Sequence, residues 1–174
     1  MDNEILIQKL AKIKLLVMDV DGTMTNAKVY YSKNGEELKK FSIRDGMGIE
    51  LLRKGQIETA ILTSESSPIV TARAKKLKIE HQIMGSRNKK KDLEDLAEKL
   101  NLLMENIAYI GDDVNDLQAI KAAGVGACPA DSVIDIIEIS DYICNTNGGN
   151  GAIREIAEKI LLAQNKSITL PESW

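Results

Sequence analysis

The stretch Leu15-Leu16-Val17-Met18-Asp19-Val20-Asp21-Gly22-Thr23 decides the fold. Its run of four apolar residues, ended by a turn-forming glycine, is typical of a short strand buried on both faces of a parallel sheet. Ligands bind beyond the carboxyl ends of such strands, so we expect Asp19 and Asp21 where chemistry takes place. Two carboxylates at a dry strand end repel each other unless a positive charge lies between them. The stretch therefore predicts a site for a divalent cation.

Two other interpretations of the aspartates are a turn cap and a calcium loop. Asp19 and Asp21 also fit a strand end that caps a turn, without any further role. A calcium loop of the helix–loop–helix kind needs glycine at loop position six and glutamate at position twelve. Counted from Asp19, those positions hold Met24 and Tyr30. The calcium loop is therefore disfavoured, while the turn cap stays open at this point.

The composition restricts the class of protein. The 174 residues are 44% hydrophobic and 28% charged, which predicts one globular domain over 1–174 with a core of its own. A net charge of −3 argues against a nucleic-acid binder. No apolar run approaches the roughly 20 residues of a membrane span, and Met1-Asp2-Asn3-Glu4 does not resemble a secretion signal. Cys128 and Cys144 lack the spacing of a metal site. We expect a cytoplasmic protein that binds neither nucleic acid nor membrane.

Helical and strand patterns alternate along the chain, which predicts βαβ units and a parallel sheet. The Asn34-Gly35 turn predicts a hairpin over about 28–43, and Asp45 is the expected N-cap of the next helix. The predicted fold is α/β, a Rossmann-like three-layer sheet with this hairpin inserted after the first strand. The expected strands are 14–18, 58–63, 81–84, 106–110, 125–128 and 142–144, and the expected helices are 4–13, 45–54, 68–78, 89–100, 114–123, 132–138 and 151–164.

Polar groups follow three further segments of the predicted sheet. Thr63 and Ser64 end a strand, Lys89 begins a helix, and a group of acids follows the strand at 106–110. The carboxyl ends of neighbouring parallel strands meet at one crevice, so these groups should converge on Asp19. Carboxylates, hydroxyls, a lysine and Mg²⁺ together suit phosphoryl transfer. The acids of the third segment are Asp112, Asp113 and Asp116.

In chain order, these segments resemble the four motifs of the haloacid dehalogenase superfamily. The hairpin and the segment from Gly148 to Glu155 further resemble its capless branch, which acts on 3-deoxy-D-manno-octulosonate 8-phosphate or on nonulosonate 9-phosphates. The resemblance covers about 10–165. Only 39 residues separate Thr23 from Thr63, and 25 separate Thr63 from Lys89, which leaves no room for a cap domain.

The resemblance implies a Mg²⁺-dependent phosphomonoester hydrolase that works through an aspartyl-phosphate. Asp19 would be the nucleophile, and Asp21 would protonate the leaving oxygen and then activate water. The implied metal ligands are Asp19, the backbone carbonyl of Asp21, and Asp112. The implied phosphate-binding residues are Thr63, Ser64 and Lys89, with Asp113 and Asp116 in support.

One departure from the octulosonate phosphatases bears on the substrate. Those enzymes commonly follow the threonine of the second motif with glycine and a basic residue, whereas this chain has Ser64-Glu65. The change resembles relatives that take 2-keto-3-deoxy-nonulosonate or sialic acid 9-phosphates. Arg73 and Lys76 are i, i+3 neighbours on a predicted helix and could bind a sugar-acid carboxylate together, or form its solvated face. The candidate substrate contacts are Arg44, Glu65, Arg73 and Lys76.

The resemblance also implies a homotetramer whose hairpins assemble and cover the open site. The hairpin at 28–43 holds much of the scarce aromatic content, which an isolated hairpin cannot bury. Packing back on its own domain is the alternative. Two other function classes are a phospho-receiver, which pairs adjacent acids on its first strand, and a catalytically idle regulator. Simple structural roles also stay open: helix caps for Asp113 and Asn115, a strand edge for His81, and a solvated face for Lys90 and Lys91.

Overall fold

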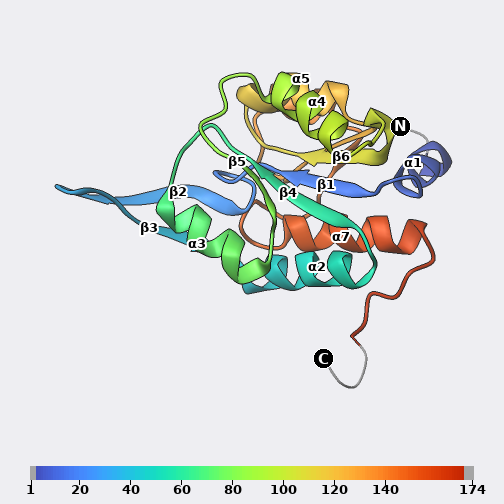
Figure 1. Cartoon of the computed structure of the whole chain (residues 1–174), viewed down its shortest axis with the longest axis horizontal. Helices are drawn as coiled ribbons and strands as arrows, with labels where there is room; N and C mark the ends of the chain where they lie inside the picture. Colours follow the sequence, from blue (N-terminus) through green and yellow to red (C-terminus); the bar gives the residue numbers. More distant parts are fainter. Residues whose placement is uncertain (1–2, 171–174) are drawn as a thin grey trace.

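The computed structural model describes residues 3–170, and a six-stranded parallel sheet runs through its centre (Figure 1). β1 lies in the middle of the sheet and pairs in parallel with β4 on one side and β6 on the other. This confirms the predicted α/β class. In spatial order the strands are β5 (His81–Ile83), β4 (Glu58–Leu62), β1 (Leu15–Met18), β6 (Ile107–Ile110), β7 (Val125–Cys128) and β8 (Tyr142–Ile143).

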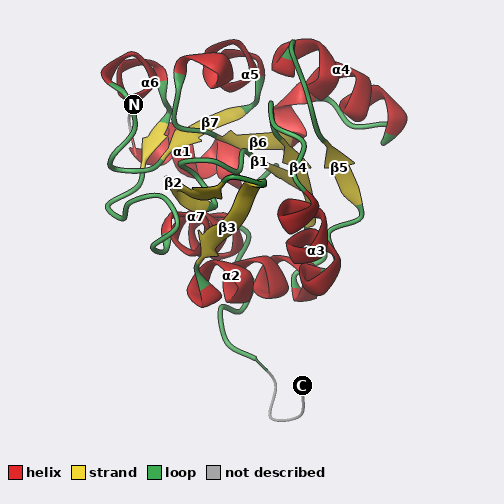
Figure 2. Cartoon of the chain, turned by 90° about the vertical axis from the view of Figure 1, so that its left-hand side faces the viewer, coloured by secondary structure: helices red, strands yellow, loops and turns green. Residues whose placement is uncertain are grey.

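Helices cover both faces of the sheet and make the three layers (Figures 1 and 2). Leu16 and Met18 of β1 belong to the core on one face, and Leu15 and Val17 to the core on the other, which is why the strand is apolar throughout. None of the helices within residues 3–170 has the length and apolarity to cross a bilayer. One face carries α1 (Asn3–Leu10), α2 (Ile43–Lys54), α3 (Pro68–Leu77) and α7 (Ala152–Ala163), and the other carries α4 (Lys89–Lys99), α5 (Leu117–Ala122) and α6 (Ile134–Ile139).

A separate antiparallel hairpin follows β1 and extends from the sheet (Figure 1). It consists of β2 (Thr25–Ser32) and β3 (Gly35–Phe41). The turn is formed by 33–34, and Gly35, which pairs with Ser32, has a φ of +107°. The predicted hairpin is confirmed, although β2 starts earlier than expected, directly after the turn that follows Asp21. Tyr30, Tyr31 and Leu38 stay exposed on it.

The predicted N-cap of α2 was wrong, and the correction links two distant helices. Ser42 is the N-cap, and its Oγ accepts a hydrogen bond from the backbone N–H of Asp45 at 3.2 Å. The buried carboxylate of Asp45 instead accepts the backbone N–H groups of Gly151 (3.3 Å) and Arg154 (2.9 Å). These groups begin α7, so Asp45 caps a helix more than a hundred residues away in sequence.

Two short 3₁₀ turns complete the chain. They span Met104–Asn106 before β6 and Val114–Asp116 before α5. The single helix predicted over 114–123 is therefore divided into the second of these turns and α5. The change of helix type lies beside the acids that follow β6, and one of these acids, Asp113, caps the 3₁₀ turn with its side chain.

Candidate active site

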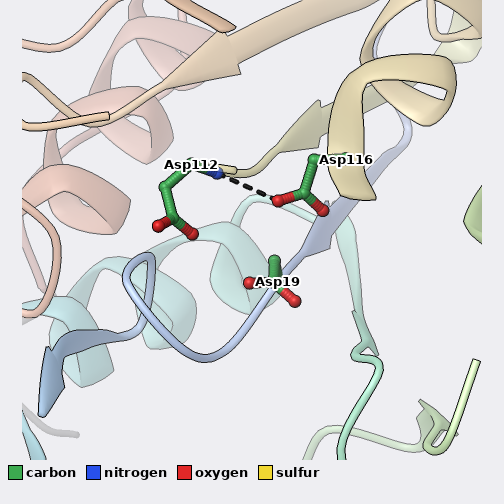
Figure 3. A group of neighbouring side chains, drawn as sticks. All are labelled: Asp19, Asp112 and Asp116. Atoms are coloured by element: carbon green, nitrogen blue, oxygen red, sulfur yellow. Dashed lines mark hydrogen bonds between the residues drawn. The ribbon is translucent and has the colours of Figure 1, made fainter. Parts of the chain in front are cut away.

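Three carboxylates meet where β1 and β6 end (Figure 3). Oxygen atoms of Asp19, Asp112 and Asp116 lie within 4.8 Å of one another; Asp19 and Asp116 are buried, and Asp112 is half-buried. Gly22 allows Asp112 to approach: its φ is +92°, and a Cβ at this position would lie 1.9 Å from Asp112 Oδ2. The Asp-x-Asp-Gly turn is therefore shaped around the carboxylate that arrives from β6.

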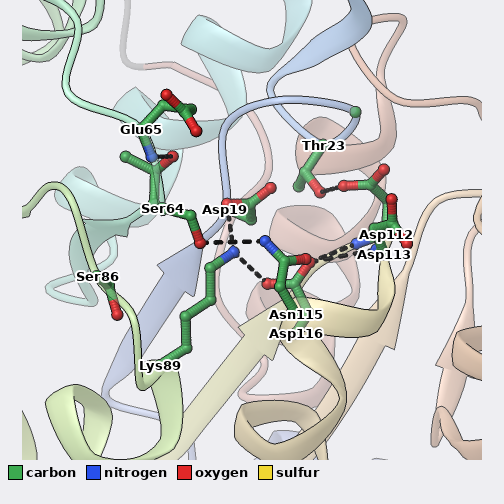
Figure 4. A network of polar contacts seen from close by, with 12 residues as sticks. Asp19, Thr23, Ser64, Glu65, Ser86, Lys89, Asp112, Asp113, Asn115 and Asp116 are labelled. Atoms are coloured by element: carbon green, nitrogen blue, oxygen red, sulfur yellow. Dashed lines mark hydrogen bonds and ion pairs between the residues drawn. The ribbon is translucent and has the colours of Figure 1, made fainter.

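Lys89, the first residue of α4, supplies the positive charge of this cluster (Figure 4). Its Nζ lies 2.7 Å from Asp19 Oδ1 and 2.6 Å from Asp116 Oδ1, and its side chain is 2% exposed. Burial alone would lower the pKa of Lys89, but the two carboxylates outweigh burial and raise it. Lys89 is thus a fixed ammonium group facing Asp19.

Asp116 has its acceptor positions filled by protein donors. Oδ1 accepts Lys89 Nζ and, at 2.6 Å, the hydroxyl of Tyr109. Oδ2 accepts the backbone N–H groups of Asp112 at 3.0 Å and Asp113 at 3.3 Å. Burial raises the pKa of Tyr109 well above its usual value, which keeps the phenol a donor. Asp116 therefore fixes both Lys89 and the loop that carries Asp112.

The charge of the cluster is unbalanced, because three carboxylates share one ammonium group. Burial and the neighbouring Asp116 raise the pKa of Asp19 to about 8. The same two causes raise the pKa of Asp112 to about 7. A divalent cation between Asp19 and Asp112 would reverse both shifts, and carboxylate oxygens are the ligands that Mg²⁺ prefers. The donor set fits this ion.

Asp21 does not join the carboxylate cluster. Its side chain is 28% exposed and forms an ion pair with the buried ammonium of Lys39, which belongs to β3 of the hairpin. Sequence reasoning missed Lys39. Nothing local distinguishes it from its neighbour Lys40, which is exposed, because the pairing depends on how the hairpin folds over the turn after β1.

Hydroxyl groups border the cluster on both sides (Figure 4). Thr63 is buried at the end of β4, and its Oγ1 accepts the backbone N–H of Glu65 at 3.3 Å. Ser64 Oγ accepts Asn115 Nδ2 at 3.1 Å, and Thr23 Oγ1 donates to Asp112 Oδ1 at 3.1 Å. Ser64 therefore ties the loop after β4 to the loop after β6.

The structural interpretation of Asp113 is confirmed. Its carboxylate accepts the backbone N–H of Val114 at 2.7 Å, as the N-cap of the 3₁₀ turn, and its side chain is exposed. A cap role for Asn115 was wrong, because its amide binds Ser64 instead.

The four candidate substrate contacts differ in their surroundings. Arg44, Glu65 and Lys76 are exposed. Arg73 is half-buried: its Nη2 donates to the carbonyl oxygen of Ser42 at 2.8 Å, and its guanidinium lies 5.5 Å from the ring centroid of Phe41. Burial lowers the pKa of Arg73. Arg73 therefore connects α3 to the start of α2, and a carboxylate site shared with Lys76 stays a prediction.

The predicted strand-edge position of His81 and the predicted solvated face of Lys90 and Lys91 are confirmed. His81 lies on β5, an edge strand, with Nε2 3.0 Å from Glu58 Oε2. Lys90 and Lys91 are exposed and pair along α4 with acids four residues further on.

The loop before α7 packs directly on the turn that follows β1. The backbone N–H of Gly149 donates to the carbonyl oxygen of Thr23 at 2.9 Å. A Cβ on Gly148 would lie 1.7 Å from the carbonyl oxygen of Gly22. Backbone therefore touches backbone here, and the loop supports the turn that holds Asp21 and Gly22.

Glu155, in the first turn of α7, holds the beginning of the loop that precedes this helix. Its carboxylate accepts the backbone N–H groups of Asn145 (2.8 Å) and Thr146 (3.1 Å) and the hydroxyl of Tyr142 (2.6 Å). Burial alone would raise the pKa of Glu155, but these hydrogen bonds outweigh burial and lower it. The loop is thus held at both ends.

Comparisons with known proteins agree with this geometry. A family model described as haloacid dehalogenase-like hydrolase matches residues 40–124. The 3-deoxy-D-manno-octulosonate 8-phosphate phosphatase KdsC of Escherichia coli K12 is 41% identical over 160 residues, which are 92% of this chain and 85% of the relative. The enzyme of that name from Haemophilus influenzae is 40% identical, over 92% of this chain and 89% of its own.

Solved structures show the same likeness. The crystal structure of 3-deoxy-D-manno-octulosonate 8-phosphate phosphatase from Moraxella catarrhalis, in complex with magnesium ion, phosphate ion and KDO, superposes with a TM-score of 0.91. It is 43% identical and covers 95% of this chain and 94% of its own. With these identities over nine-tenths of its length, the chain belongs to the haloacid dehalogenase-like hydrolases.

Proposed function

We propose that this hydrolase removes phosphate from a phosphorylated 2-keto-3-deoxy sugar acid in a Mg²⁺-dependent reaction, with 3-deoxy-D-manno-octulosonate 8-phosphate as substrate. The observation that carries the proposal is the buried cluster of Asp19, Asp112, Asp116 and Lys89 at the end of the central strand. Relatives about 40% identical over nearly the whole chain bear the name of this activity, which supports the choice of substrate.

The reaction divides into two transfers of the phosphoryl group. Asp19 forms a bond to phosphorus while the bond from phosphorus to the sugar oxygen breaks, and the proton of a protonated Asp21 passes to that oxygen. Water then attacks phosphorus, Asp21 takes its proton, and the bond to Asp19 breaks to release phosphate. Lys89 and Thr63 hold the phosphate oxygens where negative charge develops.

Mg²⁺ would be held by the carboxylates of Asp19 and Asp112 and by the backbone carbonyl of Asp21. When bound, it neutralises the charge of the acids and of the phosphate. Asp116 has no free acceptor for the ion, because four protein donors occupy its oxygens. Its role would be to fix Lys89 and the loop of Asp112.

Nonulosonate 9-phosphates are the second candidate substrates. The observation that favours them is the Ser64-Glu65 pair after Thr63, where octulosonate phosphatases commonly carry glycine and a basic residue. The hydroxyl of Ser64 accepts a hydrogen bond from Asn115, which a glycine at this position could not do. The loop after β4 therefore differs from a glycine-containing loop in its hydrogen bonding as well as in its sequence.

We further propose that the chain works as a homotetramer through the hairpin of β2 and β3. The exposed side chains of Tyr30, Tyr31 and Leu38 support this, because large apolar groups on an isolated hairpin are typical of an interface. Light scattering of the whole chain beside a Tyr31→Ser, Leu38→Ser double variant tests it. A wild-type monomer would contradict the proposal.

Steady-state kinetics test the function. We expect phosphate release from octulosonate 8-phosphate with Mg²⁺, at a higher kcat/KM than from either nonulosonate 9-phosphate, and no release with EDTA. Asp19→Asn should abolish turnover, whereas Asp95→Asn, on the exposed side of α4, should not. Turnover by a folded Asp19→Asn protein would refute the nucleophile, and a higher kcat/KM on a 9-phosphate would reverse the substrate order.

A further inference from the structure

Lys39 is a buried lysine outside the cluster of Asp19, Asp112, Asp116 and Lys89. It lies on β3 of the hairpin, and its side chain is only 1% exposed. Lysine is rarely buried to this degree unless its ammonium group is paired. Here the ammonium binds the carboxylate of Asp21 and, at 2.9 Å, that of Glu36.

The contacts continue from the hairpin to α3. The second oxygen of Glu36 accepts a hydrogen bond from the hydroxyl of Ser67, which is buried at the N-terminus of α3. Ser67 makes no side-chain cap to its own helix, so its hydroxyl serves Glu36. A continuous path therefore runs from Asp21 through Lys39 and Glu36 to the segment that follows Thr63.

The net effect of these contacts is a fixed charge. Burial alone would lower the pKa of Lys39, but the hydrogen bonds that its ammonium donates to Asp21 and Glu36 outweigh burial and raise it. Since Lys39 has three donors and two carboxylate partners on different elements, its ammonium position is determined by both. The carboxylate of Asp21 is correspondingly held on the hairpin side of the site.

We infer that Lys39 is a positioning residue for the proton transfers of Asp21, holding that carboxylate where it meets the leaving oxygen and later the attacking water. The inference rests on the proposed function and goes beyond it, since it assigns part of the acid–base geometry to the hairpin. A general acid is effective only within hydrogen-bonding reach of the atom that it protonates. The hairpin would then set the rate of the chemical step as well as shape the surface.

The test compares two substrates that differ in their need for an acid. Octulosonate 8-phosphate releases a strongly basic alkoxide oxygen, whereas p-nitrophenyl phosphate releases a weakly basic phenolate that leaves without a proton. For Lys39→Met we expect kcat/KM on the sugar-acid phosphate to fall about 100-fold, a loss in the range of general acid catalysis. On p-nitrophenyl phosphate we expect kcat/KM to fall no more than about threefold, because kcat/KM reports the steps up to departure of the leaving group, and this leaving group needs no acid.

Matched variants separate positioning from folding. Lys40→Met removes the exposed neighbouring lysine and should leave both activities unchanged. Lys39→Arg retains a charge that can reach both carboxylates and should recover part of the lost kcat/KM on the sugar-acid phosphate. If Lys39→Met does not fold, Ser67→Ala replaces it, because that change loosens the far end of the path and should lower the same ratio of activities to a smaller degree.

Failure of the positioning role and failure of the proposed function give different results. An equal loss of kcat/KM on both substrates in Lys39→Met would overturn the positioning role while the phosphatase function stands. Absence of Mg²⁺-dependent hydrolysis of either substrate by the wild-type chain would refute the proposed function itself.

Discussion

Replacing Gly148 by alanine places a methyl group where the carbonyl oxygen of Gly22 already lies. The separation would be 1.7 Å, and the carbonyl oxygen of Thr25 is only 3.0 Å away. Both neighbours are backbone atoms, so no side chain can rotate to make room. The loop before α7 and the turn after β1 must therefore separate by more than about 1 Å to reach ordinary contact.

Two effects of Gly148→Ala follow from that displacement. Overpacking of this kind costs about 1–3 kcal/mol of unfolding free energy, and each kcal/mol lowers Tm by about 2–4 °C in a chain of this size. Gly22 directly follows Asp21, the proposed general acid, and a catalytic group misplaced by about 1 Å can lose about 100-fold in rate. We therefore expect a modest fall in urea-unfolding free energy together with a large fall in kcat/KM on octulosonate 8-phosphate.

Gly55→Ala is the matched control. Its Cβ would lie 2.4 Å from Leu161 Cδ2, the far end of a flexible side chain in the contact between α2 and α7. This variant should lose stability and keep its activity, because the clash lies at the C-terminal end of α2. Wild-type stability and activity in Gly148→Ala would refute the close packing of loop and turn. Equal loss of activity in the two variants would show that the loss reports instability alone.

Two further predictions concern charged side chains that hold hydrogen-bond or ion-pair partners inside the fold. Because folding lowers the pKa of Glu155, its ionised form stabilises the protein at pH values above its usual pKa of 4.5, and this contribution is lost as the pH falls through the folded-state pKa. Glu155→Gln should therefore lower the free energy of urea unfolding at pH 7 by about 2 kcal/mol. A gap to wild type that does not narrow under acidic conditions would contradict this. Lys89→Met should lower the free energy of unfolding in EDTA by about 3–5 kcal/mol, because Asp19 and Asp116 lose their shared partner. Added Mg²⁺ should recover part of this stability. Equal losses of stability with and without Mg²⁺ would argue against a metal beside Asp19.

Local sequence patterns were enough to predict most of the fold. The four apolar residues before Asp19 specify a strand with two covered faces, and Asn34-Gly35 marks a hairpin, although its turn lies one residue earlier, at 33–34. Both signals depend only on neighbours in sequence. The convergence of Asp19, Lys89 and Asp112 also followed, since parallel strands bring their carboxyl ends to one edge.

Contacts between distant segments could not be predicted in this way. Asp45 satisfies a local cap pattern, yet its carboxylate caps α7, because Ser42 already caps its own helix. Lys39 lies beside Lys40 in a largely charged stretch that is typical of a solvated strand, and only the fold of the hairpin over Asp21 buries its side chain. Arg73 has the spacing of a ligand-binding pair, but the approach of α2 to α3 engages it with Ser42.

The central position of β1 has a consequence for how the chain folds. Leu15 pairs with Glu58 on one side and with Ile107 on the other. The first strand to be synthesised therefore stays unpaired until segments much later in the chain have been made. Non-local pairing of this kind slows folding and leaves an apolar strand unprotected in the meantime. Until β6 docks, Asp112 has no fixed place beside Asp19, and the two acids cannot bind one ion together. Recovery of Mg²⁺ affinity during refolding should therefore lag behind the recovery of helical signal, and would time the closure of the sheet.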